Sequence, residues 1–221
     1  MNRRTSTDKR KQFKQRVAQP EIIIAPGCYD AFSAKLAAHV GFEALYMTGA
    51  GVSAGLAGFP DVGLLTMSEM VEQARRICDT VDLPLISDAD TGYGGVLNIG
   101  RTVREFERAG VCAIHLEDQE IPKRCGHLPG KRLISKTKMV DHLKAALDVR
   151  GDANLLIIAR TDARAVEGMD LALDRARAYA AAGADILFVE APQGIDEVKR
   201  ICSELAVIKP LLLNRGGADK T

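Results

Sequence analysis

Short apolar runs alternate along the chain with longer stretches whose apolar residues recur every three to four positions. The first kind of segment is typical of buried strands, and the second is typical of amphipathic helices. The predicted strands are residues 22–25, 44–48, 85–88, 113–117, 155–160, 186–190 and 211–214. The predicted helices lie between them, at residues 30–40, 67–79, 98–109, 136–149, 169–182 and 195–205. Regular alternation of this kind predicts a parallel sheet covered by helices.

A weak internal repeat favours a closed barrel over an open, doubly wound sheet. In three units, a glycine that ends the helix is followed seven residues later by a polar strand end. These pairs are Gly41 and Thr48, Gly110 and Glu117, and Gly183 and Glu190. No G-x-G-x-x-G follows the first strand, which argues against a Rossmann dinucleotide site. The sequence therefore predicts an α/β fold, a (β/α)₈ TIM-type barrel. A full barrel takes about 250 residues, and because seven strands are recognisable we expect this one to be truncated after the seventh.

The composition, 47% hydrophobic and 27% charged, is that of a globular protein with a sizeable core. We expect residues 1–20, which are basic, to form a lead-in helix or tail, and residues 21–221 to form the barrel domain. A net charge of +1 gives no field that would attract nucleic acid, and no apolar run is long enough to span a membrane. Five cysteines without a C-x-x-C pair predict a reducing compartment, the cytoplasm.

Asp88 and Asp90 end one apolar strand and precede a glycine-rich turn. Residues two apart in an extended chain project to the same face, so the two carboxylates can share one hard divalent cation. An isolated D-x-D is more often a capping turn. The polar residues at other strand ends favour a site, because a barrel builds its active site there. They are Tyr46, Thr48, Gly49, Ala50, His115, Glu117, Arg160, Asp162, Glu190 and Asn214.

Oxygen ligands dominate this set, which predicts Mg²⁺, with Mn²⁺ as a second possibility, and not zinc. Asp88, Asp90 and Glu117 would hold the metal partly through water, and Arg160 would bind a substrate carboxylate. Each residue also has a structural interpretation. His115 could be a core histidine, Arg160 could pair with Asp162, and Glu190 could neutralise an arginine.

The loop at residues 121–131 carries Cys125 among basic side chains, and prolines and glycines flank it. Nearby cations would lower the pKa of the thiol and make it a usable acid or base near neutrality. The flanking residues suit a segment that folds over a bound substrate. The other cysteines have apolar or helical neighbours and are predicted to be inert.

Four motifs resemble those of the isocitrate lyase and phosphoenolpyruvate mutase superfamily, over about residues 21–221. They are Lys123-Arg-Cys-Gly-His127, Ser87-Asp-Ala-Asp-Thr-Gly-Tyr-Gly94, Ala159-Arg-Thr-Asp-Ala163 and Phe59-Pro-Asp61. The first is typical of the lyase branch. The resemblance implies a (β/α)₈ barrel, a homotetramer that exchanges its last helices, and Mg²⁺ near Asp88 and Asp90 with Asp61 and Glu117 in the ligand or water shell.

The resemblance also implies the residues around the substrate. Tyr46, Thr48, Gly49, Ala50 and Arg160 would hold the 2-oxo acid portion, and Glu190 and Asn214 would border the other carboxylate. The loop residues Lys123, Arg124, Gly126 and His127 complete this set, and His127 is also a catalytic candidate. Methylisocitrate lyases tend to carry arginine after the loop histidine. Leu128 stands there in this chain, which favours a malate-like diacid.

The implied activity is Mg²⁺-dependent carbon–carbon cleavage of a 2-hydroxy di- or tricarboxylate that resembles 2,3-dimethylmalate or methylisocitrate. The products would be a 2-oxo acid such as pyruvate and a carboxylic acid. Cys125 would be the general acid, and the base would be Tyr46 or a metal-bound water relayed through Glu117. Three alternatives remain open: an oxaloacetate acetylhydrolase, a carboxyphosphonoenolpyruvate or phosphoenolpyruvate mutase-type enzyme, and an inactive, truncated partner subunit.

Overall fold

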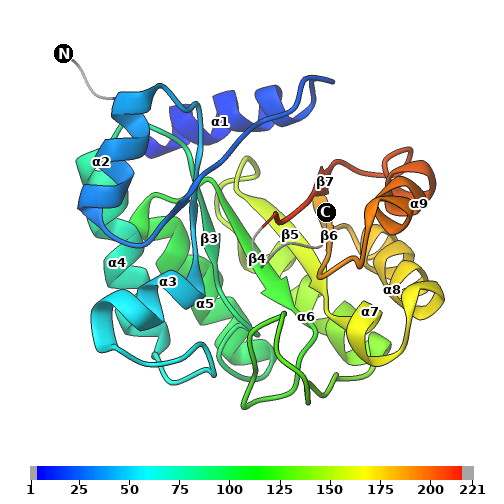
Figure 1. Cartoon of the computed structure of the whole chain (residues 1–221). Helices are drawn as coiled ribbons and strands as arrows, with labels where there is room; N and C mark the ends of the chain where they lie inside the picture. The colour runs from blue at the N-terminus through cyan, green and yellow to red at the C-terminus, as the bar shows by residue number, and fades with distance from the viewer. Residues whose placement is uncertain (1–3, 216–221) are drawn as a thin grey trace.

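A single parallel sheet of seven strands organises the computed structural model, which describes residues 4–215 (Figure 1). The strands lie side by side in sequence order, and each strand is parallel to its neighbours. They are β1 (Gly27–Cys28), β2 (Leu45–Met47), β3 (Leu85–Asp88), β4 (Ala113–Glu117), β5 (Leu156–Thr161), β6 (Ile186–Val189) and β7 (Leu211–Leu212). The predicted α/β barrel-type fold with seven strands is confirmed for the described residues.

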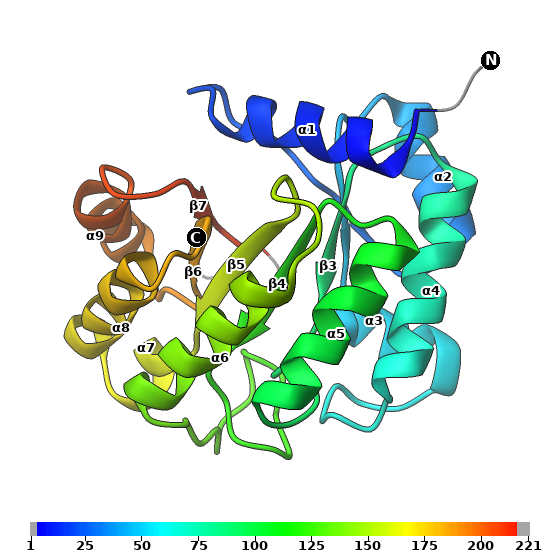
Figure 2. The same cartoon turned by 180° about the vertical axis from the view of Figure 1, so that it is seen from behind.

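The long helices that connect the strands lie on the outside of the curved sheet, and α1 lies across one end of it (Figures 1 and 2). They are α1 (Ser6–Val17), α2 (Ala31–Val40), α3 (Gly49–Val52), the π-helix η1 (Ser53–Ala57), α4 (Met67–Thr80), α5 (Val96–Ala109), α6 (Lys136–Val149), α7 (Ala163–Val166), α8 (Met169–Ala181) and α9 (Ile195–Leu205). The six predicted connecting helices agree with the structure to within two residues at each end. The short elements α3, η1 and α7 were not predicted, because a single turn carries no apolar periodicity.

The three glycines of the internal repeat stop their helices by the same local geometry. Gly41, Gly110 and Gly183 have φ values of 100°, 93° and 107°, in the left-handed region that glycine adopts without steric cost. The chain then turns into the next strand. The repeat therefore marks three equivalent helix-to-strand junctions.

The prediction of a first strand at residues 22–25 is wrong. Ile22 and Ile24 are 86% and 65% exposed. Pairing with β2 starts only at Pro26, whose carbonyl oxygen accepts a hydrogen bond of 3.0 Å from the amide of Tyr46. The isoleucine run precedes the point where the chain reaches the sheet, so its β propensity finds no neighbouring strand there.

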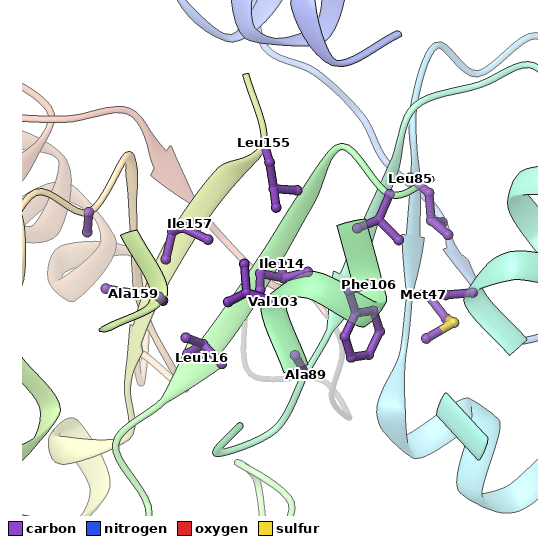
Figure 3. Packing of buried hydrophobic residues seen from close by; sticks show 14 of the residues in the cluster. Met47, Leu85, Ala89, Val103, Phe106, Ile114, Leu116, Leu155, Ile157 and Ala159 are labelled. Carbon is purple, nitrogen blue, oxygen red and sulfur yellow. The ribbon is translucent and has the colours of Figure 1, made fainter. Parts of the chain in front are cut away.

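The two faces of the sheet carry two apolar clusters. Outward-pointing residues such as Ile114 and Ile157 pack beside Val103 and Phe106 of α5 (Figure 3). The inward-pointing residues alternate with them and form a second cluster: Ala44, Ile86, Ala113, Leu156, Ile158, Ile186 and Phe188, with Cys112 and Phe13. Both faces are apolar because the sheet is buried on both sides.

Helix α1 lies across the end of the sheet where the strands begin, opposite the arrowheads (Figure 1). Its Phe13 is 3% exposed and belongs to the inner cluster. Arg10 of the same helix donates a 2.8 Å hydrogen bond from Nε to the carbonyl oxygen of Val111. Helix α1 is therefore docked against the sheet.

Replacing Phe13 with alanine should lower the free energy of unfolding by roughly 3–5 kcal/mol, because the substitution leaves a cavity in the inner cluster. Urea unfolding followed by circular dichroism measures this. Phe32→Ala on α2 is the matched control, because Phe32 is 77% exposed, and its effect should stay within about 0.5 kcal/mol. Equal effects of the two substitutions would contradict the docking of α1.

Candidate active site at the carboxyl ends of the strands

The inner face of the sheet changes from apolar to charged toward the carboxyl ends of the strands. On β4, Ala113 belongs to the inner cluster, and His115 and Glu117 follow it on the same face at two-residue spacing. The strand register pairs Asp88 with His115 and Glu117 with Arg160. All four side chains are buried, so the parallel sheet concentrates these charged residues at one rim.

Asp88 is held from three sides. Its Oδ1 lies 3.0 Å from His115 Nε2 and accepts a 2.9 Å hydrogen bond from the amide of Asp90. Its Oδ2 accepts a 3.2 Å hydrogen bond from the amide of Gly49. A Cβ at position 49 would lie 2.6 Å from that oxygen, so this close approach requires glycine.

The pKa of Asp88 lies below its usual value. Burial opposes ionisation, but the charge and hydrogen bond of His115 and the cations of Lys123 and Arg160 outweigh it. His115 is itself wedged between Tyr46, which stacks on it at 5.8 Å between ring centroids, and Phe188, which meets it edge-on at 5.9 Å. His115 therefore fits the interpretation of a buried histidine that supports Asp88.

Backbone strain marks the edges of this rim. Three described residues other than glycine have positive φ, namely Asp90 at 47°, Tyr93 at 61° and Ala191 at 54°. Such conformations cost energy for residues with a Cβ and concentrate at functional sites. Asp90 and Tyr93 follow β3, and Ala191 follows Glu190 at the end of β6. At all three positions the chain changes direction beside the charged residues.

The loop between β4 and α6 lies over the same rim, at the arrowhead end of β4 (Figure 1). Its Lys123 ammonium forms ion pairs with Oδ1 of Asp61 and with Oδ1 of Asp90, the second at 2.6 Å. The amide of Cys125 donates a 2.9 Å hydrogen bond to the carbonyl oxygen of Asp61. Gln119 fixes the loop by exchanging two hydrogen bonds with the backbone of Arg124. The cysteine is thus docked beside the carboxylates.

Gly126 allows this loop to approach the sheet closely. A Cβ on this buried residue would lie 2.5 Å from Arg160 Nη2 and 2.6 Å from Glu190 Cγ. His127 follows, with Nε2 3.4 Å from Glu190 Oε1, while the Arg124 side chain is exposed and donates to the Pro129 carbonyl at 3.4 Å. The loop contacts the charged rim through Lys123, Gly126 and His127, and through Lys131, whose Nζ lies 3.6 Å from Asp162 Oδ1. Arg124 points away.

Comparison with known proteins adds the family. A family model for phosphoenolpyruvate phosphomutase matches residues 13–219. The chain is 50% identical over 190 residues to 2,3-dimethylmalate lyase of Eubacterium barkeri, a match that covers 86% of this chain and 66% of the relative. It is 45% identical over 203 residues to 2-methylisocitrate lyase of Shewanella oneidensis, covering 92% of this chain and 69% of that one. The chain belongs to the phosphoenolpyruvate mutase and isocitrate lyase superfamily.

Solved structures of this superfamily agree in fold. A crystal structure of 2,3-dimethylmalate lyase superposes with a TM-score of 0.92 at 38% identity, covering 99% of this chain and 73% of that one. Oxaloacetate acetylhydrolase with the inhibitor 3,3-difluorooxalacetate gives a TM-score of 0.92 at 36% identity, covering 97% and 74%. The chain spans about two thirds of the length of the curated relatives it matches.

The arginine of the superfamily motif Ala159–Ala163 forms an ion pair with the nearby carboxylate of Asp162. Arg160 donates from Nε and Nη2 to the two carboxylate oxygens of Asp162, at 3.0 and 3.1 Å. Its Nη1 lies 3.6 Å from Glu190 Oε2, and its guanidinium carbon lies 5.3 Å from the ring centroid of Phe188. Asp162 therefore pairs with one edge of the guanidinium, as the structural interpretation of the R-x-D pair expects, and the Glu190 carboxylate lies beside Nη1.

A buried carboxylate that sequence reasoning missed supports this arginine. Asp118 accepts hydrogen bonds from the Asp162 amide at 2.9 Å and from the Thr161 and Tyr179 hydroxyls at 2.7 Å each. It thereby fixes the turn that carries Asp162. The available signal was a second carboxylate directly after Glu117, and such a residue at a buried strand end needs hydrogen-bond donors.

The remaining predicted residues differ in how closely they join this site. Thr48 Oγ1 accepts a 3.2 Å hydrogen bond from the amide of Gly51 and so caps α3, which also contains Ala50. Asn214 lies two residues after β7 and is exposed. Tyr46 lies on β2 and stacks on His115. Burial is the largest cause that raises the pKa of Tyr46 well above its usual value, and the negative charge of Asp88 is the next. Tyr46 is therefore protonated at neutral pH, which argues against the predicted role as base.

The environment of Cys125 corrects the expectation of a lowered pKa. Burial raises the pKa of the thiol, and the opposing effects of the His127 amide, Lys123 and Arg160 are smaller. The neutral thiol is consequently the resting form, which suits an acid better than a nucleophile. Cys28, Cys78 and Cys112 are buried, and burial raises the pKa of each of them.

A divalent cation fits the oxygen-rich part of the rim. A cavity of about 10 Å³, the size of one water, is lined by Gly49, Asp61 and Asp90 among others. Oε1 of the buried Glu117 lacks a hydrogen-bond partner, and burial raises the pKa of Glu117 well above its usual value. Among residues 4–215, no group of three or more His, Cys, Asp or Glu side chains is already arranged to hold a metal ion. Mg²⁺ needs only one or two carboxylates because it keeps its waters.

The thiol pKa can be measured through the pH dependence of Cys125 alkylation by iodoacetamide, because only the thiolate reacts. In a Cys202→Ser background, which removes the other partly exposed thiol, the rate should rise with a midpoint above the pKa of a free cysteine. Cys125→Ser in the same background is the control and should abolish the fast-labelled site. A midpoint near or below neutrality would overturn the assignment of a protonated thiol.

Proposed function

We propose that this chain is the catalytic barrel of a Mg²⁺-dependent carbon–carbon lyase, with Mn²⁺ as a possible substitute. The proposed substrate is a 2-hydroxy di- or tricarboxylate, which is split into a 2-oxo acid such as pyruvate and a carboxylic acid. The observation that carries the proposal is the hydrogen bond of 2.9 Å that docks Cys125 on Asp61 at the carboxylate rim. The 50% identity to 2,3-dimethylmalate lyase supports it.

Different residues of this chain would serve the three tasks of the proposed reaction, which are binding, proton removal and proton delivery. Asp88 would hold the metal, with Asp61, Asp90 and Glu117 in its ligand or water shell. When bound, the Mg²⁺ would supply positive charge to the carboxylate and hydroxyl oxygens at C2 of the substrate. A solved structure of the related phosphonopyruvate hydrolase contains oxalate and Mg²⁺.

Glu117 would accept the hydroxyl proton through water, because its Oε1 has no hydrogen-bond partner among the described residues. As the C2–C3 bond breaks, its electron pair moves to the departing fragment. Cys125 then donates its thiol proton to that carbon, and solvent restores the proton. Arg160 would bind the carboxylate of the 2-oxo acid.

Leu128 gives the proposal its substrate preference. It follows His127 in the loop and is 44% exposed. An arginine at this position would add a cation for a third carboxylate, so the leucine favours a malate-like diacid over a tricarboxylate. We further propose a cytoplasmic homo-oligomer, a tetramer by family resemblance.

Replacing Cys125 with serine should lower the rate of cleavage by about two to four orders of magnitude, the usual contribution of a general acid. Pyruvate released from a panel of 2-hydroxy diacids, with 2,3-dimethylmalate and methylisocitrate included, is measured by a coupled assay. Oxalate binding in the presence of Mg²⁺ should be unchanged and serves as the control for an intact site. Full turnover by the serine variant would remove the proposed acid.

A second candidate, oxaloacetate hydrolysis, is favoured by the structural likeness to oxaloacetate acetylhydrolase. The same assay with oxaloacetate separates the two, since release of acetate and oxalate would select the hydrolase. Chelation with EDTA should abolish either activity, and added Mg²⁺ should restore it. A folded chain without turnover on any of these substrates would instead favour the non-catalytic partner.

A further inference from the structure

A second cavity, of about 290 Å³, lies where helices α5 and α6 run side by side on the outside of the sheet (Figure 2). Its walls include Thr91, Gly95, Ile121, Ile134, Lys138 and His142. Ile134 belongs to the outer apolar cluster, and the residues that line this cavity do not line the small one beside Asp61 and Asp90. The cavity is therefore separate from the charged rim inside the sheet.

The N-terminus of α5 faces this cavity through Gly94 and Gly95. Gly95 is the N-cap residue, so no side chain caps the helix, and the first turn contains no acidic residue. The amide of Ile99 donates a 3.0 Å hydrogen bond to the Gly95 carbonyl oxygen. The amides of residues 96–98 precede it and have no acceptor within the helix. These amides and the positive end of the helix dipole favour an anion.

Two buried polar side chains point independently to a ligand. His142 is 5% exposed and lines the cavity. Its ring makes no hydrogen bond with any of the described residues. Thr91, which is 6% exposed, also lines the cavity, and its hydroxyl is likewise without a hydrogen bond to the described residues. Because buried polar groups normally have partners, the two side chains fit an occupant that carries polar atoms.

The charges around the cavity favour an anionic occupant. Lys138 precedes His142 by four residues and so lies on the same face of α6. Burial and, next, the charge of Lys138 lower the pKa of His142, and Asp141 opposes them more weakly. Glu120 is an acidic residue on the wall, but its carboxylate pairs with Arg132 at 3.2 Å. A carboxylate between Lys138 and His142 would therefore be stabilised by its surroundings.

The size and the apolar part of the cavity limit the class of ligand. A volume of 290 Å³ corresponds to roughly ten water molecules, which is enough for a small organic acid. Ile134 is buried and Ile121 is 59% exposed, and both offer apolar surface. An acid with a short hydrocarbon body would contact these isoleucines as well as the amides of α5, whereas inorganic phosphate would contact the amides alone.

We propose that this cavity is a second binding site, which takes a small organic monocarboxylate. The carboxylate would lie at the start of α5, between Lys138 and His142, and the hydrocarbon body would lie against Ile121 and Ile134. The hydroxyl of Thr91 would donate a hydrogen bond to the ligand. None of these residues takes part in the proposed reaction, so the inference does not rest on the proposed function.

The first test is the binding of isobutyrate to the native chain, followed by nuclear magnetic resonance. Isobutyrate should shift the amide resonances of residues 96–98 and the ring resonances of His142, and the shifts should saturate. Isobutyramide has the same shape without the charge and should leave these resonances unchanged. Equal shifts by the amide, or no saturable shift by the acid at these residues, would overturn the proposal.

The second test uses two lysines of α6. Lys138→Gln removes a cation from the wall of the cavity and should weaken isobutyrate binding about fivefold. Lys136→Gln is the matched control, because Lys136 lies two residues earlier, pairs with Asp174 and does not line the cavity. This variant should bind isobutyrate as the native chain does. Lys138 is exposed, so its replacement should leave the chain folded, which circular dichroism checks. Native affinity in a folded Lys138→Gln variant would contradict the site.

Inorganic phosphate tests the apolar part of the site, and it should bind at least several-fold more weakly than isobutyrate. Equal or tighter binding of phosphate would overturn the assignment to an organic acid. Isobutyrate shifts confined to Thr48, Gly49 and Glu117 would place the acid at the charged rim and refute the second site. Saturable shifts at residues 96–98 in a chain that cleaves no substrate would refute the proposed lyase and leave the second site standing.

Discussion

The burial of several carboxylates at one end of the sheet is the constraint on which the rest of this structure depends. Taking a charged group out of water is expensive unless a partner or hydrogen-bond donors compensate it. Five of these carboxylates are compensated in different ways. Asp88 has backbone amides and His115, Asp118 has two hydroxyls and an amide, and Asp162 has the fork of Arg160. Asp61 and Asp90 instead depend on a lysine brought by a loop.

This arrangement explains why the pKa values of neighbouring acids diverge. Asp88 is kept ionised, whereas burial raises the pKa of Glu117 and of Asp90, and nearby carboxylates add to the effect. Pairs of acids pushed apart in this way can carry different roles in one site. Cys125 completes the set as a thiol that stays protonated in its half-buried loop. The rim thus offers a fixed anion, a carboxyl group that can exchange a proton and a neutral acid.

Much of the fold could be predicted from the sequence because its signals are periodic and local. The strands β3 and β4 and the helices α6 and α9 have the predicted bounds. The isoleucines at 22 and 24 misled the prediction, since their propensity says nothing about where the sheet begins. The convergence of Asp88, Glu117 and Arg160 followed from the parallel order of the strands. The bidentate pairing of Arg160, the hydrogen bonds of Asp118 and the raised pKa of Cys125 depend on tertiary contacts and desolvation, which residue spacing does not encode. The roles assigned to the site residues stay predictions.

Helix α1 has a consequence for how protons reach this site. Phe13 and the inner apolar cluster fill the barrel below the charged rim, and they offer no chain of polar groups along which a proton could travel. Protons therefore reach the buried acids from the carboxyl-end rim, where the segment around Cys125 lies. The rate at which the interior acids equilibrate with solvent should accordingly follow the opening of that segment, while breathing of the sheet contributes little.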